Sequence, residues 1–137
     1  FPIQVNENLL LLDDTYNANV DSLQAAIDVL KGYDAFRILL VGDMKELGED
    51  SLKCHQAVGE HAKQAQLDLV LSYGIESAVI SEAVLGKHFT DKAELTAYAL
   101  DIIKQKLQEN QKVVVLAKGS RSMKMEETIY SLKDSLC

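Results

Sequence analysis

The chain has 137 residues, of which 47% are hydrophobic and 26% are charged, and its formal net charge is −7. This length fits one domain with a core, and the negative charge argues against a nucleic acid or an anionic membrane surface as the main partner. No apolar run reaches the roughly 20 residues of a membrane-spanning helix, no signal peptide is visible, and only two cysteines occur, so we expect a cytoplasmic protein without a membrane partner.

Apolar runs and helical patterns alternate through the first half of the sequence. The four leucines at 9–12 are typical of a strand buried on both faces. Apolar residues spaced by three and four over 20–30 predict a helix, and Asp21 resembles the start of a capping box. Residues 36–43 predict a second buried strand, which a polar loop connects to a helix over 52–65.

The second half continues the alternation. The predicted elements are a strand at 67–74, a helix at 75–85, a very short strand at 87–89, a long helix capped by Asp91, a strand at 112–119 and a last helix with Met125, Ile129, Leu132 and Leu136 on one face. Strands that alternate with helices of this length indicate βαβ units. We therefore predict an α/β fold, a Rossmann-like doubly wound and mostly parallel sheet of about six strands with helices on both faces.

One domain accounts for the whole sequence. There are no repeats or low-complexity tracts, and Pro2 is the only proline. We predict a single Rossmann-like domain over residues 1–137. Because the first residue is Phe1 rather than Met, we also expect this domain to be cut from a longer chain.

Polar residues follow three of the predicted strands. In open α/β sheets, ligands bind beyond the carboxyl ends of the strands. The residues expected at that rim are Asp13, Asp14, Thr15, Tyr16, Asn17 and Asn19 after the first strand, Gly42 and Asp43 after the second, and Lys118, Gly119, Ser120 and Arg121 after the last.

The segment "KGSR" at 118–121 suits an anion. Gly119 would let the backbone approach a ligand, a following helix would present free N–H groups, and Arg121 offers a planar fork for a carboxylate or phosphate. The alternative is that Ser120 or Ser122 caps the helix while Arg121 pairs with a surface acid. The pattern alone leaves both interpretations open.

The segment "DDTYNAN" at 13–19 offers carboxylates, amides and an aromatic ring. Such a set suits a ribose and a base, but Asp and Asn are also common turn and cap residues. His55 lies on the apolar stripe of its helix, where a buried structural histidine is commoner than a catalytic one. His61 and His88 show no partners, and no phosphate loop or G-x-G-x-x-G turn occurs, so a triphosphate cradle would lie elsewhere.

Three segments in series resemble the C-terminal domain of the Mur ligases. They are "LLDDTYNANVDSLQAAI", "LVGDMKELGEDSLKCHQAVGEHA" and "KGSRSMKMEE", which occur in the same order and cover most of the chain. The resemblance is strongest to the branch that adds D-alanyl-D-alanine to UDP-N-acetylmuramoyl-tripeptide in peptidoglycan synthesis. It implies a three-domain, ATP-dependent ligase that works through an acyl phosphate.

The resemblance also implies partners and site residues. ATP and magnesium would bind mainly to a central ATPase domain of the same chain, and this domain would close over it, so the fragment alone would hold no complete catalytic set. Contacts to the adenosine part of ATP are expected from Asp14, Tyr16, Asn17 and Asn19. From the chemistry of the strand ends, contacts to the incoming dipeptide are expected from Asp43, Lys118, Ser120 and Arg121.

Two other classes of function compete with a ligase domain. A receiver-type phosphorylation domain also has paired acids after its first strand and a lysine after its last. Its phospho-acceptor should be an aspartate after the third strand, where this chain has Ser72 in "LSYG". The other alternative is a structural or regulatory Rossmann-like module that binds no ligand.

Overall fold

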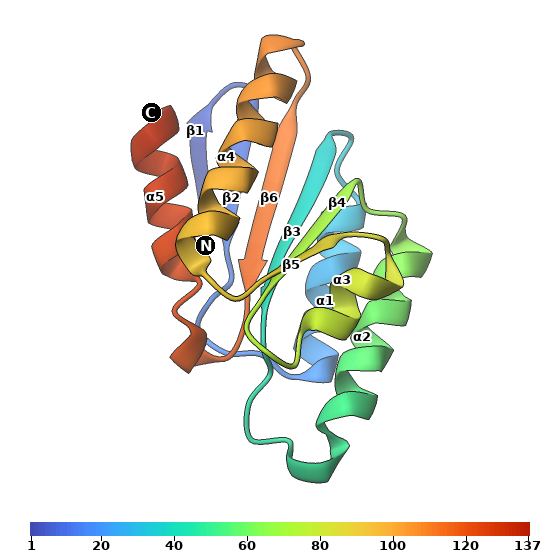
Figure 1. Cartoon of the computed structure of the whole chain (residues 1–137). Helices are drawn as coiled ribbons and strands as arrows, with labels where there is room; N and C mark the ends of the chain where they lie inside the picture. The colour runs from blue at the N-terminus through green and yellow to red at the C-terminus, as the bar shows by residue number, and fades with distance from the viewer.

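The computed structural model describes residues 1–137, which form one six-stranded sheet with helices on both faces (Figure 1). The strands are β1 (Pro2–Asn6), β2 (Leu9–Asp13), β3 (Phe36–Gly42), β4 (Leu69–Tyr73), β5 (Lys87–Phe89) and β6 (Val113–Lys118). The helices are α1 (Val20–Lys31), α2 (Ser51–Ala65), α3 (Ala78–Ala83), α4 (Lys92–Gln108) and α5 (Glu126–Leu136). Two short 3₁₀ turns, Gly48–Asp50 and Arg121–Met123, precede α2 and α5.

The strand order is β1-β2-β6-β3-β4-β5. All neighbouring pairs from β2 to β5 are parallel, and β1 pairs with β2 in the antiparallel direction. The predicted fold class is confirmed. The strand β1 was not predicted, because it lies at the edge of the sheet and alternates exposed with half-buried residues instead of forming an apolar run. Pro2 begins it, a position at which a missing N–H costs no ladder bond.

Two hydrophobic clusters lie on opposite faces of the sheet. Helices α4 and α5 cover one face, with Leu95, Ile103 and Ile129 fully buried, and α1, α2 and α3 cover the other face, as Figure 1 shows. Strand residues alternate between the two clusters, as the pleat requires. No helix is long and apolar enough to cross a membrane.

The start of α1 differs from the predicted capping box. Asn19, not Asp21, is the N-cap residue, and its side chain accepts a hydrogen bond from the N–H of Ser22 at 2.8 Å. The hydroxyl of Ser22 accepts in turn from the N–H of Asn19 at 3.0 Å. The cap predicted at Asp91 is confirmed, since its carboxylate accepts from the N–H of Ala93 at 2.9 Å.

The carboxyl ends of β3 and β6 touch at two glycines. A Cβ atom built on Gly119 would lie 3.0 Å from the Cα of Gly42, and one built on Gly42 would lie 3.1 Å from the Cβ of Met123. Gly119 therefore permits a close approach between two strand ends, rather than the approach of a ligand that its sequence context suggested.

Candidate functional site at the carboxyl ends of the strands

Three loops meet at the rim predicted from the sequence. Residues 14–19 follow β2, residues 43–47 follow β3 and residues 119–125 follow β6. Because β6 lies between β2 and β3 in the sheet, its loop is in the middle of the three. This is the edge where open parallel sheets bind their ligands.

A cavity of about 690 Å³ opens between these loops. Its lining residues are Tyr16, Asn17, Lys45, Glu46, Ser120, Arg121 and Ser122. Four of the predicted site residues are thus brought together, two from each predicted set. Half of the nucleotide set and half of the dipeptide set therefore line one cavity.

The side chains of Tyr16 and Asn17 present a ring and an amide to solvent. Tyr16 is 82% exposed, an unusual value for an aromatic residue in a folded domain. The side-chain oxygen of Asn17 accepts from the N–H of Ala18 at 2.8 Å, which leaves its amide nitrogen free to donate. A base or ribose is the kind of group that such a pair can bind.

The turn that carries Ser120 and Arg121 lacks the helix start that both interpretations of its sequence placed there. A 3₁₀ turn follows Ser120, and α5 begins only at Glu126, so no helix N-terminus faces a ligand next to Gly119. The side chain of Ser120 makes no capping hydrogen bond either. Its hydroxyl accepts from the N–H of Lys45 at 2.7 Å, and its own N–H donates to the carbonyl of Asp43 at 2.9 Å.

Arg121 pairs with an acid, as the alternative interpretation held. One of its terminal nitrogens lies 2.8 Å from Oε2 of Glu126, while its side chain stays 58% exposed. The guanidinium group has five N–H donors, so this pair orients the fork and leaves donors for an anion. The other oxygen of Glu126 is buried without a hydrogen-bond partner.

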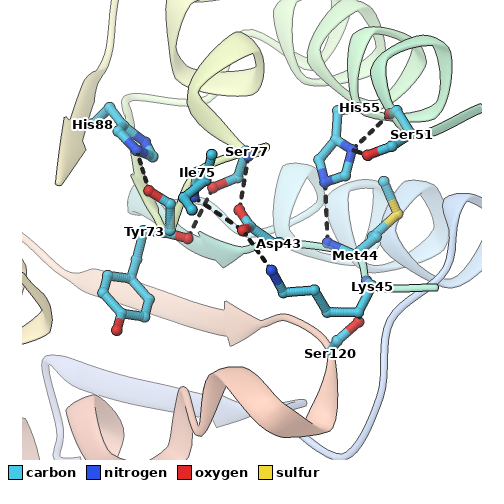
Figure 2. A network of polar contacts seen from close by, with 11 residues as sticks. Asp43, Met44, Lys45, Ser51, His55, Tyr73, Ile75, Ser77, His88 and Ser120 are labelled. Carbon is cyan, nitrogen blue, oxygen red and sulfur yellow. Dashed lines mark hydrogen bonds and ion pairs between the residues drawn. The ribbon is translucent and has the colours of Figure 1, made fainter. Parts of the chain in front are cut away.

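Asp43 lies inside the rim as a buried link between loops. Figure 2 shows its carboxylate between the turn after β4 and the side chain of Lys45. It accepts from the N–H of Ser77 at 2.8 Å, from the N–H of Ile75 at 3.0 Å and from the ammonium group of Lys45 at 3.2 Å. Burial acts to raise the pKa of Asp43, but the hydrogen bonds from Ile75 and Ser77 outweigh it and hold the pKa below its ordinary value.

Lys118 is also buried and does not line the cavity. Its side chain is 5% exposed and lies 3.1 Å from Oδ2 of Asp14, whose side chain is 47% exposed. Its ammonium group also donates to the carbonyl of Asn17 at 2.9 Å. Asn19 uses its side-chain oxygen to cap α1. Asp14, Asn19, Asp43 and Lys118 therefore hold the rim together, whereas Tyr16, Asn17, Ser120 and Arg121 face the cavity.

The predicted site residues did not include Lys45, Glu46 and Ser122, which line the cavity, or Gly74, which packs against Asp43. Lys45 lines the cavity with a side chain 41% exposed, and its place just after a buried strand was a usable signal. Gly74 has φ of +123°, and a Cβ atom there would lie 2.5 Å from Oδ1 of Asp43. Only the folded geometry reveals this contact, because the two residues are far apart in the sequence.

The three histidines all have partners within the protein. His55 is fully buried, and Figure 2 shows it between Ser51 and Met44, accepting from the N–H of Met44 at 3.0 Å. His61 lies 2.7 Å from a carboxylate oxygen of Asp28, and His88 contacts Ser72 at 2.6 Å, so the expectation that these two lack partners was wrong.

No three His, Cys, Asp or Glu side chains lie close enough together to hold a metal ion.

The profile described as "Mur ligase, glutamate ligase domain" matches residues 2–121. The chain belongs to the Mur ligase family. This assignment removes the receiver interpretation, because the rim residues that suggested paired acids and a lysine lie within the matched Mur ligase segment.

Named Mur ligases are similar over nearly the whole chain. The UDP-N-acetylmuramoyl-tripeptide–D-alanyl-D-alanine ligase of Haemophilus influenzae is 71% identical over 99% of this chain and 30% of its own length. The enzyme of the same name from Escherichia coli is 49% identical over 98% of this chain and 29% of its own length. The chain thus spans about a third of the length of these Mur ligases.

Solved Mur ligase structures share the fold. A crystal structure of MurF from Acinetobacter baumannii superposes with a TM-score of 0.88 at 30% identity, over 98% of this chain and 29% of the other. MurF from Thermotoga maritima, solved in complex with ADP, superposes with a TM-score of 0.80 at 26% identity, over 98% of this chain and 30% of the other.

Proposed function

We propose that this chain is the C-terminal domain of a three-domain, ATP-dependent ligase of the cytoplasm. The ligase adds D-alanyl-D-alanine to UDP-N-acetylmuramoyl-tripeptide in peptidoglycan synthesis. The observation that carries the proposal is the 71% identity, over 99% of the chain, to the Haemophilus influenzae enzyme of that name. The 690 Å³ cavity supports it, because an exposed ring and amide (Tyr16, Asn17) lie there beside a hydroxyl and a guanidinium group (Ser120, Arg121) at one strand edge.

The proposed reaction has two steps. The γ-phosphoryl group of ATP passes to the terminal carboxylate of the tripeptide, which yields an acyl phosphate and ADP. The amine of D-alanyl-D-alanine then attacks the carbonyl carbon, an amide bond forms, phosphate leaves and the amine loses a proton. The phosphate loop and the magnesium ion belong to a central ATPase domain that precedes this one, since charge on the transferring phosphoryl group needs them.

The residues of this domain bind and orient in that reaction. Tyr16 stacks on the base of ATP, and the free amide of Asn17 donates to the base or ribose. The fork of Arg121, with the hydroxyl of Ser120, holds the dipeptide carboxylate while its amine attacks. Correct placement matters, because a shift of about 1 Å can lower such a rate on the order of a hundredfold.

A chimeric enzyme tests the proposal. Residues 1–137 replace the corresponding segment of the Escherichia coli relative, which is 49% identical. We expect phosphate release that requires ATP, UDP-N-acetylmuramoyl-tripeptide and D-alanyl-D-alanine together. A folded chimera that ignores the dipeptide, or accepts another amine in its place, contradicts the proposal. The control is a chimera that also carries Lys104→Met, an exposed change on α4 away from the rim. It should show the same dependence on the three substrates.

The isolated chain should be inactive under the same conditions. The proposal places the phosphate loop outside these residues, so the purified 137-residue chain should release no phosphate from ATP above the background rate. Measurable turnover by the fragment would show that the cradle for the triphosphate lies within it.

A further inference from the structure

Lys118 differs from the other cations of the rim in its exposure. Its side chain is 5% exposed, compared with 58% for Arg121 and 41% for Lys45. It lies at the end of β6, beneath the loop that follows β2, and is absent from the walls of the 690 Å³ cavity. A buried ammonium group is costly unless it is paired and hydrogen-bonded.

Both contacts of this ammonium group go to the loop after β2. It lies 3.1 Å from Oδ2 of Asp14 and donates to the carbonyl oxygen of Asn17 at 2.9 Å. These two contacts lie on either side of Tyr16, whose ring makes no comparable contact and is 82% exposed. The loop has three further anchors: the N–H of Asp14 donates to the carbonyl of Ala117 at 3.1 Å, Thr15 bonds to Asp13, and Asn19 caps α1. None of these bonds is made by Tyr16 or by the backbone of Asn17.

We propose that Lys118 is a positioning residue, not a ligand contact. Its buried charge fixes the loop that presents Tyr16 and Asn17 relative to the turn that presents Ser120 and Arg121. Lys118 immediately precedes that turn in sequence, so one side chain sets the distance between the two walls of the cavity. The identity of the ligands rests on the proposed function, whereas the order of the loop does not.

Backbone order parameters of the 137-residue chain test the proposal without any ligand. In Lys118→Met, the order parameters of residues 15–17 should fall from about 0.85 toward 0.6 or below. They should stay unchanged in Lys104→Met, the matched loss of an exposed lysine on α4. Order parameters of residues 15–17 that are the same in Lys118→Met and in the unaltered chain would overturn the proposal.

A second variant keeps the test decisive where Lys118→Met does not fold. Asp14→Asn removes the charged partner at a half-exposed site and leaves the lysine in place. It should lower the same order parameters, and order parameters that stay unchanged in Asp14→Asn would overturn the proposal. Where Lys118→Met also folds, the double variant should show little further change, because both substitutions break one link. Independent, additive effects of the two changes would contradict a shared role.

Kinetics of the full-length ligase separate positioning from direct contact. We expect Lys118→Met to raise KM for ATP about tenfold and Lys118→Arg, which keeps the charge, to recover most of the loss. A raised KM for D-alanyl-D-alanine with unchanged loop order would mean that Lys118 touches the dipeptide, and would overturn the proposal. If the unaltered ligase makes no such amide, the proposed function fails, yet the loop-order experiment still decides the role of Lys118.

Discussion

Gly74 lies so close to Asp43 that a Cβ atom on the glycine would fall 2.5 Å from the aspartate Oδ1. The glycine also has φ of +123°, a backbone conformation that other residues rarely adopt. The turn after β4 therefore needs a residue without a side chain at Gly74, and it is held by the buried carboxylate of Asp43.

Gly74→Ala should destabilise the domain by about 2 kcal/mol or more, because it adds both backbone strain and a clash with a buried carboxylate. Urea denaturation followed by circular dichroism measures this change. Gly48→Ala is the control, since Gly48 also has positive φ, +58°, but nothing lies within 4 Å of its added Cβ. If Gly74→Ala lowers the free energy of unfolding no more than Gly48→Ala does, the contact with Asp43 does not limit the residue at position 74.

Asp43→Asn should cost about 2 kcal/mol at pH 7, since a neutral amide accepts more weakly from the N–H groups of Ile75 and Ser77 and adds donors that lack partners. The pKa of Asp43 is lowered in the folded state, so its contribution is fully present above its ordinary value of 3.8. That contribution is lost as the pH falls through the lower folded-state value.

The difference in unfolding free energy between the unaltered chain and Asp43→Asn should therefore narrow below about pH 4. Urea titrations at pH 7 and at pH 3 compare the two. A difference that stays constant across this range would mean that the charge of Asp43 does not contribute to stability.

His55→Phe should lower the free energy of unfolding by about 2 kcal/mol and leave the catalytic constant of the full-length ligase unchanged. The ring accepts from the N–H of Met44 and bonds to the carbonyl of Ser51 at 2.7 Å, so its loss leaves the buried N–H of Met44 unpaired and removes the bond to Ser51. Thermal unfolding and initial rates measured on the same preparation give both values. A large fall in rate with normal stability would instead point to a catalytic histidine.

Tyr16→Ala should raise KM for ATP about tenfold without changing stability, because stacking on a base contributes roughly 1–3 kcal/mol and the ring is otherwise exposed. Tyr16→Phe keeps the ring and should bind ATP nearly as well. Initial rates at varied ATP give KM for each variant. Equal KM values for ATP in the alanine and the phenylalanine variants would show that the ring does not contact the nucleotide.

Arg121→Lys should raise KM for D-alanyl-D-alanine more than KM for ATP or for the UDP-tripeptide. A lysine offers one point charge where the guanidinium group offers a planar fork, and it also loosens the pair with Glu126. Initial rates with each of the three substrates varied in turn provide internal controls. If KM for ATP rises more than KM for D-alanyl-D-alanine, Arg121 contacts the nucleotide and not the dipeptide.

The parts of the fold that were predictable are those that local pattern determines. The runs at β2, β3 and β6 are apolar because both faces of these strands are covered, and such runs are visible in any sequence. The edge strand β1 was missed because its pattern is half polar. The cap of α1 was misplaced by two residues, since Asn19 and Asp21 are both good caps and only the folded backbone selects one.

The meeting of the three loops at one edge was predictable, and the contacts that their residues make were not. The carboxyl-end rule placed all three loops correctly. Whether a polar side chain faces the cavity or supports it depends on partners distant in sequence, such as the carbonyl 101 residues away that Lys118 binds. Asp43 likewise bonds to an N–H group 32 residues away. No local pattern reveals such pairs.

The contact between Gly42 and Gly119 and the bonds of Asp43 join the loops after β3, β4 and β6, and Lys118 joins the loop after β2 to them. The backbone of the loops around the cavity is thus arranged when the domain folds, and little backbone conformational entropy remains to be lost when a substrate arrives. Any opening and closing of the enzyme around its substrates would then be a hinge motion outside these loops. The rim would move as one rigid body.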